Sequence, residues 1–450
     1  MKTLSQLLKI SIFTTIFLSP LYIIRWSYWG LPTTLLEHLI GLTVLIWLVF
    51  RMGKGKSFSD SAETGLNPFQ GLTLFLLLAC IISLFKTPDL RAGLGIFKAY
   101  FIEPIIFFYV LTDCLKRGII KRKEIIWALT CAALWLSLIG ISQILFKWPV
   151  FAIHEATGGR AHATFNSGNA LALYIGPIIA LLLALEIGAA PSKGPPLCAV
   201  RSSAKNRKII RKGKPRIFEG LVLILITFVL ILTKSTGGLV GLGVSIAFLV
   251  SARFLSLKLL RKLIITGAML YLISHFVLLS IIPKLTPQVA NPWVRPGGTG
   301  LTRLCVWEGT VNLLKDNPML GAGLSGFKEL YSTQYYTCDA EPLEYPHNFV
   351  LNFWTETGIL GLTAIIGIIA LVFYRELKKG NKSKINWGIL AALIYCLAHG
   401  LVDVPYFKND LALVFWVIIA LVETGRACPP TDNTCQGTTF IAVKGNCLLD

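Results

Sequence analysis

A polar stretch from Pro283 to Pro346 carries the residues whose types are best suited to chemistry. Arg303, within it, has a guanidinium group that can hold two oxygens of a phosphate at once. His347 follows the stretch directly, and a histidine side chain can take up or release a proton near neutral pH. Apolar runs lie on both sides. This combination of a cation and a proton acceptor predicts a reactive site at a membrane surface.

The composition places the whole chain in a membrane. Of its 450 residues, 54% are hydrophobic and only 15% are charged, and the mean hydropathy is +0.67. These values are typical of an integral membrane protein and exclude an ordinary soluble enzyme of several domains. The net charge of +20 would suggest nucleic-acid binding in a soluble chain. In a membrane protein, the distribution of that charge among the connecting loops is more informative than its total.

Apolar runs long enough to cross a bilayer recur along the chain, since a spanning helix needs about 20 residues. We predict an all-α polytopic membrane protein of about 12 transmembrane helices. The expected spans are residues 7–24, 31–50, 69–85, 94–112, 125–146, 169–187, 219–233, 237–255, 263–282, 348–374, 386–402 and 411–424. The predicted organisation is helices 1–9 in residues 1–282, an outer cap in 283–347, helices 10–12 in 348–425, and a tail in 426–450.

Basic residues are distributed unequally between the two sides of this arrangement. With both termini inside, the inner segments, counted with the inner ends of the adjoining spans, carry 30 lysines and arginines, the outer segments carry 12, and Lys98 falls within a span. Such asymmetry follows the positive-inside rule, so we expect cytoplasmic termini. The inner loop Lys193–Arg216 holds nine basic residues but none of the aromatic residues that bind single-stranded nucleic acid. We expect this loop to face anionic lipid, and we expect no nucleic-acid partner.

The outer stretch has helical order of its own. Apolar residues, among them Trp307, recur at helical spacing between Leu301 and Lys315. The tripeptide Asp316–Pro318 predicts the end of that helix. Ser325 is expected to cap a second short helix, and Asn348 to cap the tenth span. Two amphipathic helices predict a cap lying on the membrane surface.

Two segments near this cap resemble the O-antigen ligase and polymerase family of bacterial membrane glycosyltransferases. They are RLCVWEGTVNLLKDNPMLGAGLSGFKELY and HNFVLNFWTETGILGL, which carry an arginine and tryptophan four residues apart, a DNPxxGxGxxxF turn and an HN…L…E.G..G entry into the next span. A third segment, GRAHATFNSGNALALYI, is similar to the family's R…TF…N.LA.Y pattern. The likeness covers roughly residues 158–365 and implies a GT-C-like fold. The matching positions are Arg160, Thr164, Phe165, Asn169, Ala172, Arg303, Trp307, Asp316, Asn317, Pro318, Gly321, Gly323, Phe327, His347, Asn348, Glu356, Gly358 and Gly361.

This resemblance implies transfer of a glycan from a polyprenyl-pyrophosphate carrier, such as undecaprenyl pyrophosphate, to a glycan or lipid acceptor. The reaction would take place on the outer face of a bacterial cytoplasmic membrane, in lipopolysaccharide or another cell-envelope polysaccharide. His347 and Arg303 would be catalytic, with His347 acting as the base or orienting the acceptor and Arg303 binding the pyrophosphate. The residues expected to bind pyrophosphate or glycan are Arg160, Lys234, Asn169, Trp307 and Glu356.

One turn departs from the family's pattern. Where many members have the sequence SRG, this chain reads Thr233-Lys234-Ser235-Thr236-Gly237-Gly238. Thr236 stands at the place of the usual arginine, and Lys234 is the nearest cation. Whether Lys234 replaces that arginine is left open by the sequence, as is the choice between a ligase and a polymerase.

Several of these residues also have a structural interpretation. A histidine at the entrance of a span is commonly an interfacial or capping group, and Arg303 could be an exposed helix charge near Glu308. Glu103 and Glu356 lie within apolar spans, where an ionisable side chain is costly and therefore predicts a function. Asp403, at the outer end of the eleventh span, could orient a residue of the site.

The outer loops contain no pair of aspartates with DxD spacing. We therefore expect no catalytic metal and no cofactor, with cationic side chains assisting departure of the pyrophosphate. Direct displacement would invert the anomeric carbon. Cys305 and Cys338, both in the outer stretch, could form a disulfide in an oxidising compartment or remain two free thiols.

Two other classes of function compete with a transferase. A transporter of a small anion such as bicarbonate could use the twelve spans, the intramembrane glutamates and the basic outer residues. The chain has no strong internal repeat, which argues against that class. A structural scaffold in envelope assembly is the third class, and it would leave Arg303 and His347 replaceable without loss.

Overall fold

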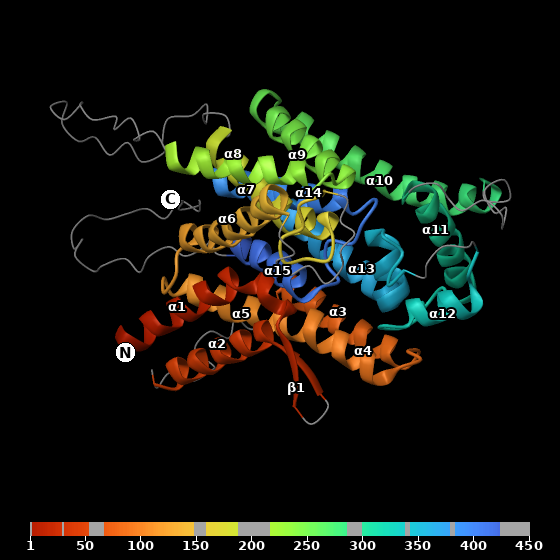
Figure 1. The fold of residues 1–450 in the computed structure, drawn as a ribbon, viewed down its shortest axis with the longest axis horizontal. Helices are drawn as coiled ribbons and strands as arrows, with labels where there is room; N and C mark the ends of the chain where they lie inside the picture. Colours follow the sequence, from red (N-terminus) through yellow and green to blue (C-terminus); the bar gives the residue numbers. More distant parts are fainter. Residues whose placement is uncertain are drawn as a thin grey trace, which may run out of the picture.

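The computed structural model describes residues 2–28, 31–53, 67–147, 159–187, 217–285, 299–337, 343–378 and 383–423. Within these ranges the regular secondary structure is helical apart from one short hairpin, which confirms the predicted all-α class (Figure 1). The predicted tail 426–450, the basic loop Lys193–Arg216 and Cys338 lie outside the described residues.

A helical segment stands at each of the predicted spans. In the described ranges, six helices are long and apolar enough to cross a membrane, and four shorter ones are also apolar, as expected for an integral membrane protein. The segments are α1 Lys2–Phe17, α2 Leu35–Met52, α3 Pro68–Leu84, α4 Leu90–Ile96 continued by a π turn Phe97–Ile102 and α5 Glu103–Lys116, α6 Arg122–Phe146, α7 Gly168–Ile187, α8 Ile217–Leu232, α9 Thr236–Phe254, α10 Leu257–Leu285, α13 Phe349–Lys378, α14 Lys384–His399 and α15 Asn409–Glu423.

Short polar residues fix where several of these helices begin. Asn67 precedes Pro68 and accepts the amides of Phe69 and Gln70, while the Gln70 side chain accepts the Asn67 amide. This is a complete capping box with proline at the first helical position. Ser383 caps α14 in the simpler way, since its side chain accepts the Asn386 amide.

The predicted start of the second span is wrong. Strand β1 (Arg25–Tyr28) pairs antiparallel with β2 (Leu31–Thr34), and α2 begins only at Leu35. Thr34 supplies the physical reason, because its side chain accepts the Glu37 amide and so caps α2. The hairpin therefore ends where the polar threonines end, and the apolar helix follows.

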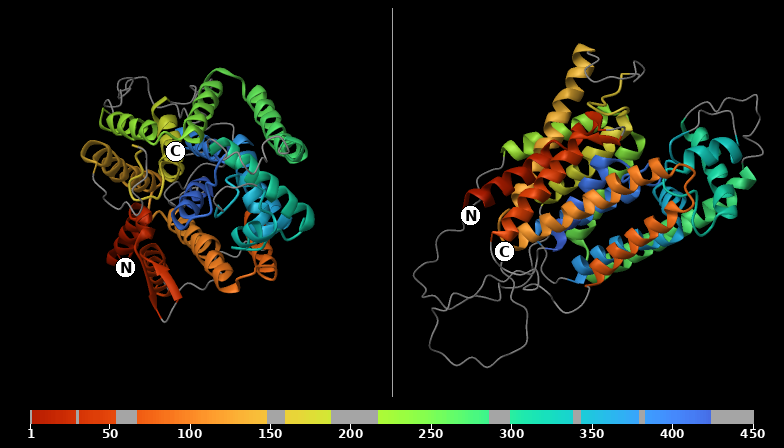
Figure 2. Two further views of the ribbon diagram at one scale, coloured as in Figure 1. Left: turned by 45° about the vertical axis from the view of Figure 1, so that its right-hand side comes forward. Right: turned by 90° about the horizontal axis from the view of Figure 1, so that it is seen from below.

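Helices α11 (Thr299–Asp316) and α12 (Phe327–Gln334) gather at one end of the bundle, away from the start of α1 (Figures 1 and 2). Helix α11 ends at Asp316, as the proline two residues later predicts. The prediction for α12 is wrong in one respect. Its N-cap is Gly326, which makes no side-chain contact, and Ser325 has a φ of 65° and caps nothing.

The centre of the bundle is formed by α7, α9 and α14, which approach closely at glycines. A Cβ atom on Gly176 of α7 would overlap the Tyr395 ring of α14, and Gly241 of α9 touches the same ring. The Tyr395 hydroxyl donates to the Ala172 carbonyl at 3.0 Å. This packing brings together the start of α7, the start of α9 and the end of α14.

The opposite end of the bundle has its own polar contacts. The Lys9 ammonium lies 2.6 Å from the Glu124 carboxylate, and Arg261 donates to the Leu377 carbonyl. These residues belong to segments that the charge distribution assigns to one side of the membrane. The residues of the candidate site belong to segments that the charge distribution assigns to the opposite side of the membrane.

Candidate functional site

His347 is fixed by contacts to the residues on both sides of it. Trp307 Nε1 donates to the Pro346 carbonyl at 2.7 Å, and Asn348 Nδ2 donates to the Leu401 carbonyl at 3.0 Å. His347 has a φ of 48°, in the left-handed region that residues other than glycine seldom adopt. Strained backbone of this kind persists only where the surroundings hold it. Trp307 and Asn348 supply that support.

Asn348 also begins α13, as predicted. Its Oδ1 accepts the amides of Val350 and Leu351, each at 3.0 Å. The cap confirms the expected role of this asparagine. His347 therefore lies directly before the residue that caps this helix.

Asp403 orients the His347 imidazole. Nδ1 of His347 donates to Oδ1 of Asp403 at 3.0 Å, which is the orienting contact anticipated for this aspartate. Burial alone would raise the pKa of Asp403, but the hydrogen bond and charge of His347, with His399 and the Val404 amide, lower it to about 2. The carboxylate is therefore ionised at neutral pH. Nε2 of His347 makes no hydrogen bond to any described residue, so this nitrogen is free to contact a substrate.

Arg303 approaches this pair from α11. It is half-buried and lies within electrostatic range of His399, as does Asp403. His399 ends α14 and is 1% exposed, and its Nδ1 has no hydrogen-bond partner among the described residues. The structure thus brings the two residues predicted as catalytic to the same end of α14.

Arg160, Asn169 and Lys234 form a second group. Arg160 Nε donates to the Thr233 carbonyl at 2.7 Å, and its Nη2 donates to Asn169 Oδ1 at 2.7 Å. Lys234 is exposed, and its ammonium nitrogen would lie 3.9 Å from a Cβ placed on Gly159. All three residues predicted to bind pyrophosphate or glycan in these loops are therefore neighbours.

The start of α9 connects the two groups. A Cβ on Gly237 would lie 2.6 Å from the His399 ring, so only glycine permits this approach. Ser235 is the N-cap of α9, and its hydroxyl accepts the Gly238 amide at 3.2 Å. Because the N-terminus of a helix carries partial positive charge, α9 adds to the field of Arg160 and Lys234. The arrangement suits an anion.

Glu356 and Trp307, also predicted to bind substrate, contact the protein's own backbone. Glu356 is 4% exposed, and its Oε2 accepts the Ser325 amide at 2.6 Å and the Phe327 amide. The Trp307 indole N–H is used by Pro346, as described above. Both side chains thus hold segments of the cap in position.

The glycine-rich turn of the cap enters a break in α13. Gly358 interrupts that helix with a φ of 67°. The Ala322 amide donates to the Thr355 carbonyl at 2.7 Å, inside the break. A Cβ on Gly321 would overlap that carbonyl, and Gly323 is equally close to the backbone of Thr87. The glycines of the DNPxxGxG pattern therefore serve the docking of this turn.

Sequence reasoning missed His399. The available signal was a histidine at the outer end of an apolar span, four residues before Asp403. That spacing would have placed both side chains at the same membrane surface. The contact that decides its place, with Gly237, joins residues far apart in the chain.

Cys305 is disulfide-bonded. Cys338, its predicted partner, lies outside the described residues, but Thr337 immediately before it donates to the Cys305 carbonyl at 2.8 Å. Disulfides persist in oxidising compartments. This bond accords with a cap that faces away from the cytoplasm.

Comparison with known proteins agrees with the resemblance seen in the sequence. Residues 221–366 match the family described as O-antigen ligase. The matched segment contains Lys234, Arg303, His347 and Glu356, whereas Arg160 and Asp403 lie outside it.

Two proteins of Rickettsia, both named as candidate polysaccharide ligases, are also similar. The protein of Rickettsia conorii is 24% identical over 186 residues, which are 38% of this chain and 41% of the relative. The protein of Rickettsia typhi is 24% identical over 176 residues, which are 37% of this chain and 41% of the relative. The similarity therefore spans less than half of each relative.

Proposed function

We propose, from the match of residues 221–366 to the O-antigen ligase family, that this protein transfers a glycan from a polyprenyl-pyrophosphate carrier to a hydroxyl of a glycan or lipid acceptor. One observation carries the proposal. His347 has its Nδ1 bound to an ionised carboxylate and its Nε2 free, at the same end of α14 that Arg303 approaches. A positioned base beside a cation is what glycosyl transfer from a pyrophosphate requires.

The proposed step is a single displacement. Nε2 of His347 takes the proton of the acceptor hydroxyl while the acceptor oxygen forms a bond to the anomeric carbon. The bond between that carbon and the pyrophosphate oxygen breaks, and the electron pair leaves with the pyrophosphate. The anomeric carbon is inverted. Asp403 stabilises the imidazolium that forms, since its negative charge lies against Nδ1.

Cationic side chains take the departing charge in this proposal. Arg303 is placed near the base, and Arg160, Lys234 and the start of α9 make up the second positive group. Guanidinium groups hold phosphate oxygens with two parallel hydrogen bonds. The mechanism therefore assigns charge neutralisation to arginine and lysine and is metal-independent.

The proposed setting is a bacterial cytoplasmic membrane with cytoplasmic termini, an outer cap over residues 283–347 and transmembrane helices on either side of it. The charge distribution and the disulfide-bonded Cys305 support this orientation. The match to a ligase family favours a transferase over the anion transporter.

Complementation tests the proposal. A bacterial host lacking this protein would receive the wild-type gene, His347→Ala, Arg303→Ala or Lys315→Ala. Surface polysaccharide, lipid-linked glycan and membrane levels of each variant would be measured. We expect both site variants to insert normally, to lose at least about 100-fold in transfer and to accumulate lipid-linked glycan.

Lys315→Ala is the matched control. Lys315 is an exposed cation on the same helix as Arg303. It should leave surface polysaccharide unchanged. Normal polysaccharide in the two site variants, together with reduced uptake of labelled bicarbonate, would overturn the transferase and support the transporter.

A further inference from the structure

Three tyrosines from distant parts of the chain lie within electrostatic range of one another, and one of them is beside His347. Tyr22 lies in the 3₁₀ turn Ser19–Ile23, Tyr100 in the π turn, and Tyr345 two residues before His347. The phenol of Tyr22 is within electrostatic range of those of Tyr100 and Tyr345. We refer to Tyr22, Tyr100 and Tyr345 as the tyrosine cluster.

The cluster adjoins the catalytic base through Tyr345. The Tyr345 and His347 rings have centroids 5.0 Å apart. The Tyr345 phenol lies within electrostatic range of both Asp403, which orients His347, and Asp410, at the start of α15. A group bound at the cluster would therefore lie next to the His347 ring.

The hydroxyls of the cluster are unused. None of the three tyrosine side chains hydrogen-bonds to any residue in the described ranges. Two other tyrosines differ, since the Tyr174 hydroxyl meets Ser19 at 2.7 Å and the Tyr406 hydroxyl donates to the Tyr100 carbonyl at 2.8 Å. Tyr100 and Tyr345 are half-buried, so these side chains are not sealed in the core and can meet a bound molecule. Unused hydroxyls beside a catalytic base point to a ligand.

Asp410 gives a second, independent sign. It is 0% exposed, and neither carboxyl oxygen has a side-chain partner among the described residues. Its carboxyl lies in electrostatic range of Tyr22, Tyr100 and Tyr345. Arg25 lies 5.7 Å over the Tyr22 ring. The cluster is therefore flanked by one carboxyl and one guanidinium group.

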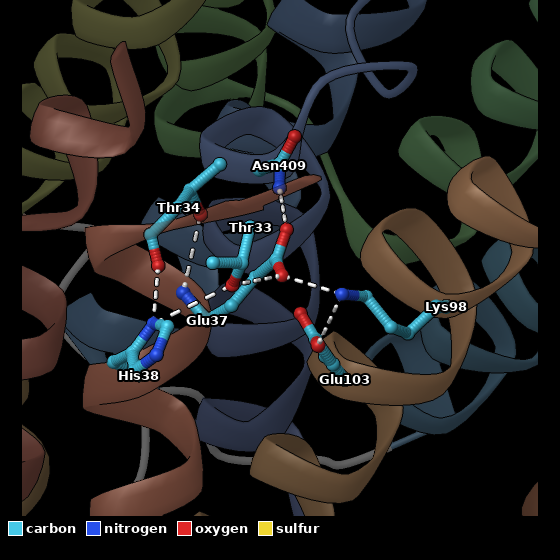
Figure 3. A network of polar contacts seen from close by, with 7 residues as sticks. All are labelled: Thr33, Thr34, Glu37, His38, Lys98, Glu103 and Asn409. Atoms are coloured by element: carbon cyan, nitrogen blue, oxygen red, sulfur yellow. Dashed lines mark hydrogen bonds and ion pairs between the residues drawn. The ribbon is translucent and has the colours of Figure 1, made fainter. Parts of the chain in front are cut away.

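A network around Glu37 holds the elements that carry the cluster (Figure 3). The Glu37 carboxylate accepts from Thr33 at 2.9 Å, from Lys98 at 2.6 Å and from Asn409 at 3.3 Å. Thr33 belongs to the hairpin that carries Arg25, Lys98 to the π turn that carries Tyr100, and Asn409 precedes Asp410. π turns occur often at functional sites. One buried carboxylate thus sets the geometry of three sides of the cluster.

We propose that the tyrosine cluster is the binding subsite for the acceptor saccharide, whose attacking hydroxyl it presents to His347. This inference rests on the proposed function. Phenol hydroxyls both donate and accept hydrogen bonds, and their rings offer apolar faces, so they suit the alternating surface of a sugar. The ionised carboxylate of Asp403 repels a pyrophosphate, which instead suits Arg303 and the Arg160–Lys234 group.

Steady-state kinetics would test the subsite. The full-length protein would be reconstituted in nanodiscs and supplied with lipid-linked glycan and with acceptor-bearing lipid, both extracted from the host that lacks the protein. The concentration of each at half-maximal rate would be measured for wild type, Tyr100→Phe and Tyr345→Phe. Each variant removes one oxygen and keeps the ring. Tyr335→Phe, in the cap and bound to Asp316, is the matched control.

We expect Tyr100→Phe and Tyr345→Phe each to raise the half-saturating acceptor concentration about three- to ten-fold, the effect of one lost hydrogen bond. The half-saturating donor concentration and the values for Tyr335→Phe should be unchanged. A rise for the donor alone would overturn the acceptor subsite and assign the cluster to the donor glycan. Unchanged values in both variants would also overturn it while the proposed function stands. Failure of the wild-type protein to transfer glycan would overturn both.

Discussion

Asp403 and Glu356 are buried carboxyl residues near the capped end of the bundle, and they do different things there. Asp403 holds a side chain, His347, and leaves one nitrogen of that side chain free. Glu356 accepts hydrogen bonds from backbone amides of the cap. The turn that it holds in this way makes its other backbone hydrogen bonds within itself and to α13. The difference shows how to separate chemistry from support among polar residues of a motif: chemistry needs an atom that the protein leaves unbound.

The largest expected effect comes from disrupting the contact between Asp403 and His347. Asp403→Asn keeps an oxygen for the His347 contact but removes the charge that stabilises the imidazolium. We expect the transfer rate per inserted molecule to fall about 100-fold or more, with the half-saturating concentrations of donor and acceptor nearly unchanged. Rates in nanodiscs would measure this. A variant as fast as wild type would remove Asp403 from the mechanism.

Disrupting the glycine-rich turn that Glu356 holds should change the stability of the protein instead of its transfer rate. A Cβ on Gly323 would lie 2.6 Å from the Thr87 amide nitrogen, at a φ of 80°. Gly323→Ala should therefore cost about 1–3 kcal/mol of unfolding free energy by overpacking. Protein levels and the thermal unfolding midpoint in detergent should fall, while the rate per folded molecule stays within about two-fold, below the loss of one hydrogen bond.

The control for this variant is Gly243→Ala, whose added Cβ would have no neighbour within 4 Å. Its midpoint should match wild type. If Gly323→Ala lowered the rate of well-folded protein strongly, the turn would take part in chemistry and the comparison with Asp403 would fail.

The smallest effect concerns pH. The pKa of Asp403 is lowered from its ordinary value of 3.8 to about 2 in the folded protein. The stabilisation from its ionised form is therefore complete above about pH 4 and is lost as the pH falls through about 2, and it amounts to about 2 kcal/mol. Unfolding midpoints of wild type and Asp403→Asn at pH 6 and pH 2 would test this. We expect the difference between them to shrink in acid.

The spans could be predicted because each depends on about 20 consecutive residues. The end of α11 at Asp316 and the cap at Asn348 could also be predicted, because each depends on only a few neighbouring residues. The hairpin before α2 was missed because Thr34 stops it by contacting Glu37, a choice between two local structures that apolar content alone does not decide.

Contacts between distant residues set the limits of the site prediction. Family motifs selected Arg160, Lys234, Arg303 and His347, and the structure groups them at one end of the bundle. The Ser325 prediction was wrong because Glu356, 31 residues later, takes the Ser325 amide. His399 was missed because its neighbour Gly237 comes from another span. Periodicity reports which face of a helix is apolar, and it does not report which helix lies opposite.

The contact between Glu37 and Asn409 joins residues 372 positions apart. During synthesis, α2 enters the membrane long before α15 exists. Until then the Glu37 carboxylate lacks its amide partner, and only its contacts with Lys98 and Thr33 can form. The contacts of Glu37 in α2 are therefore complete only after α15 has been synthesised. A chain truncated before α15 should be retained by the quality-control proteases of the membrane, even though the helices described before α15 are intact.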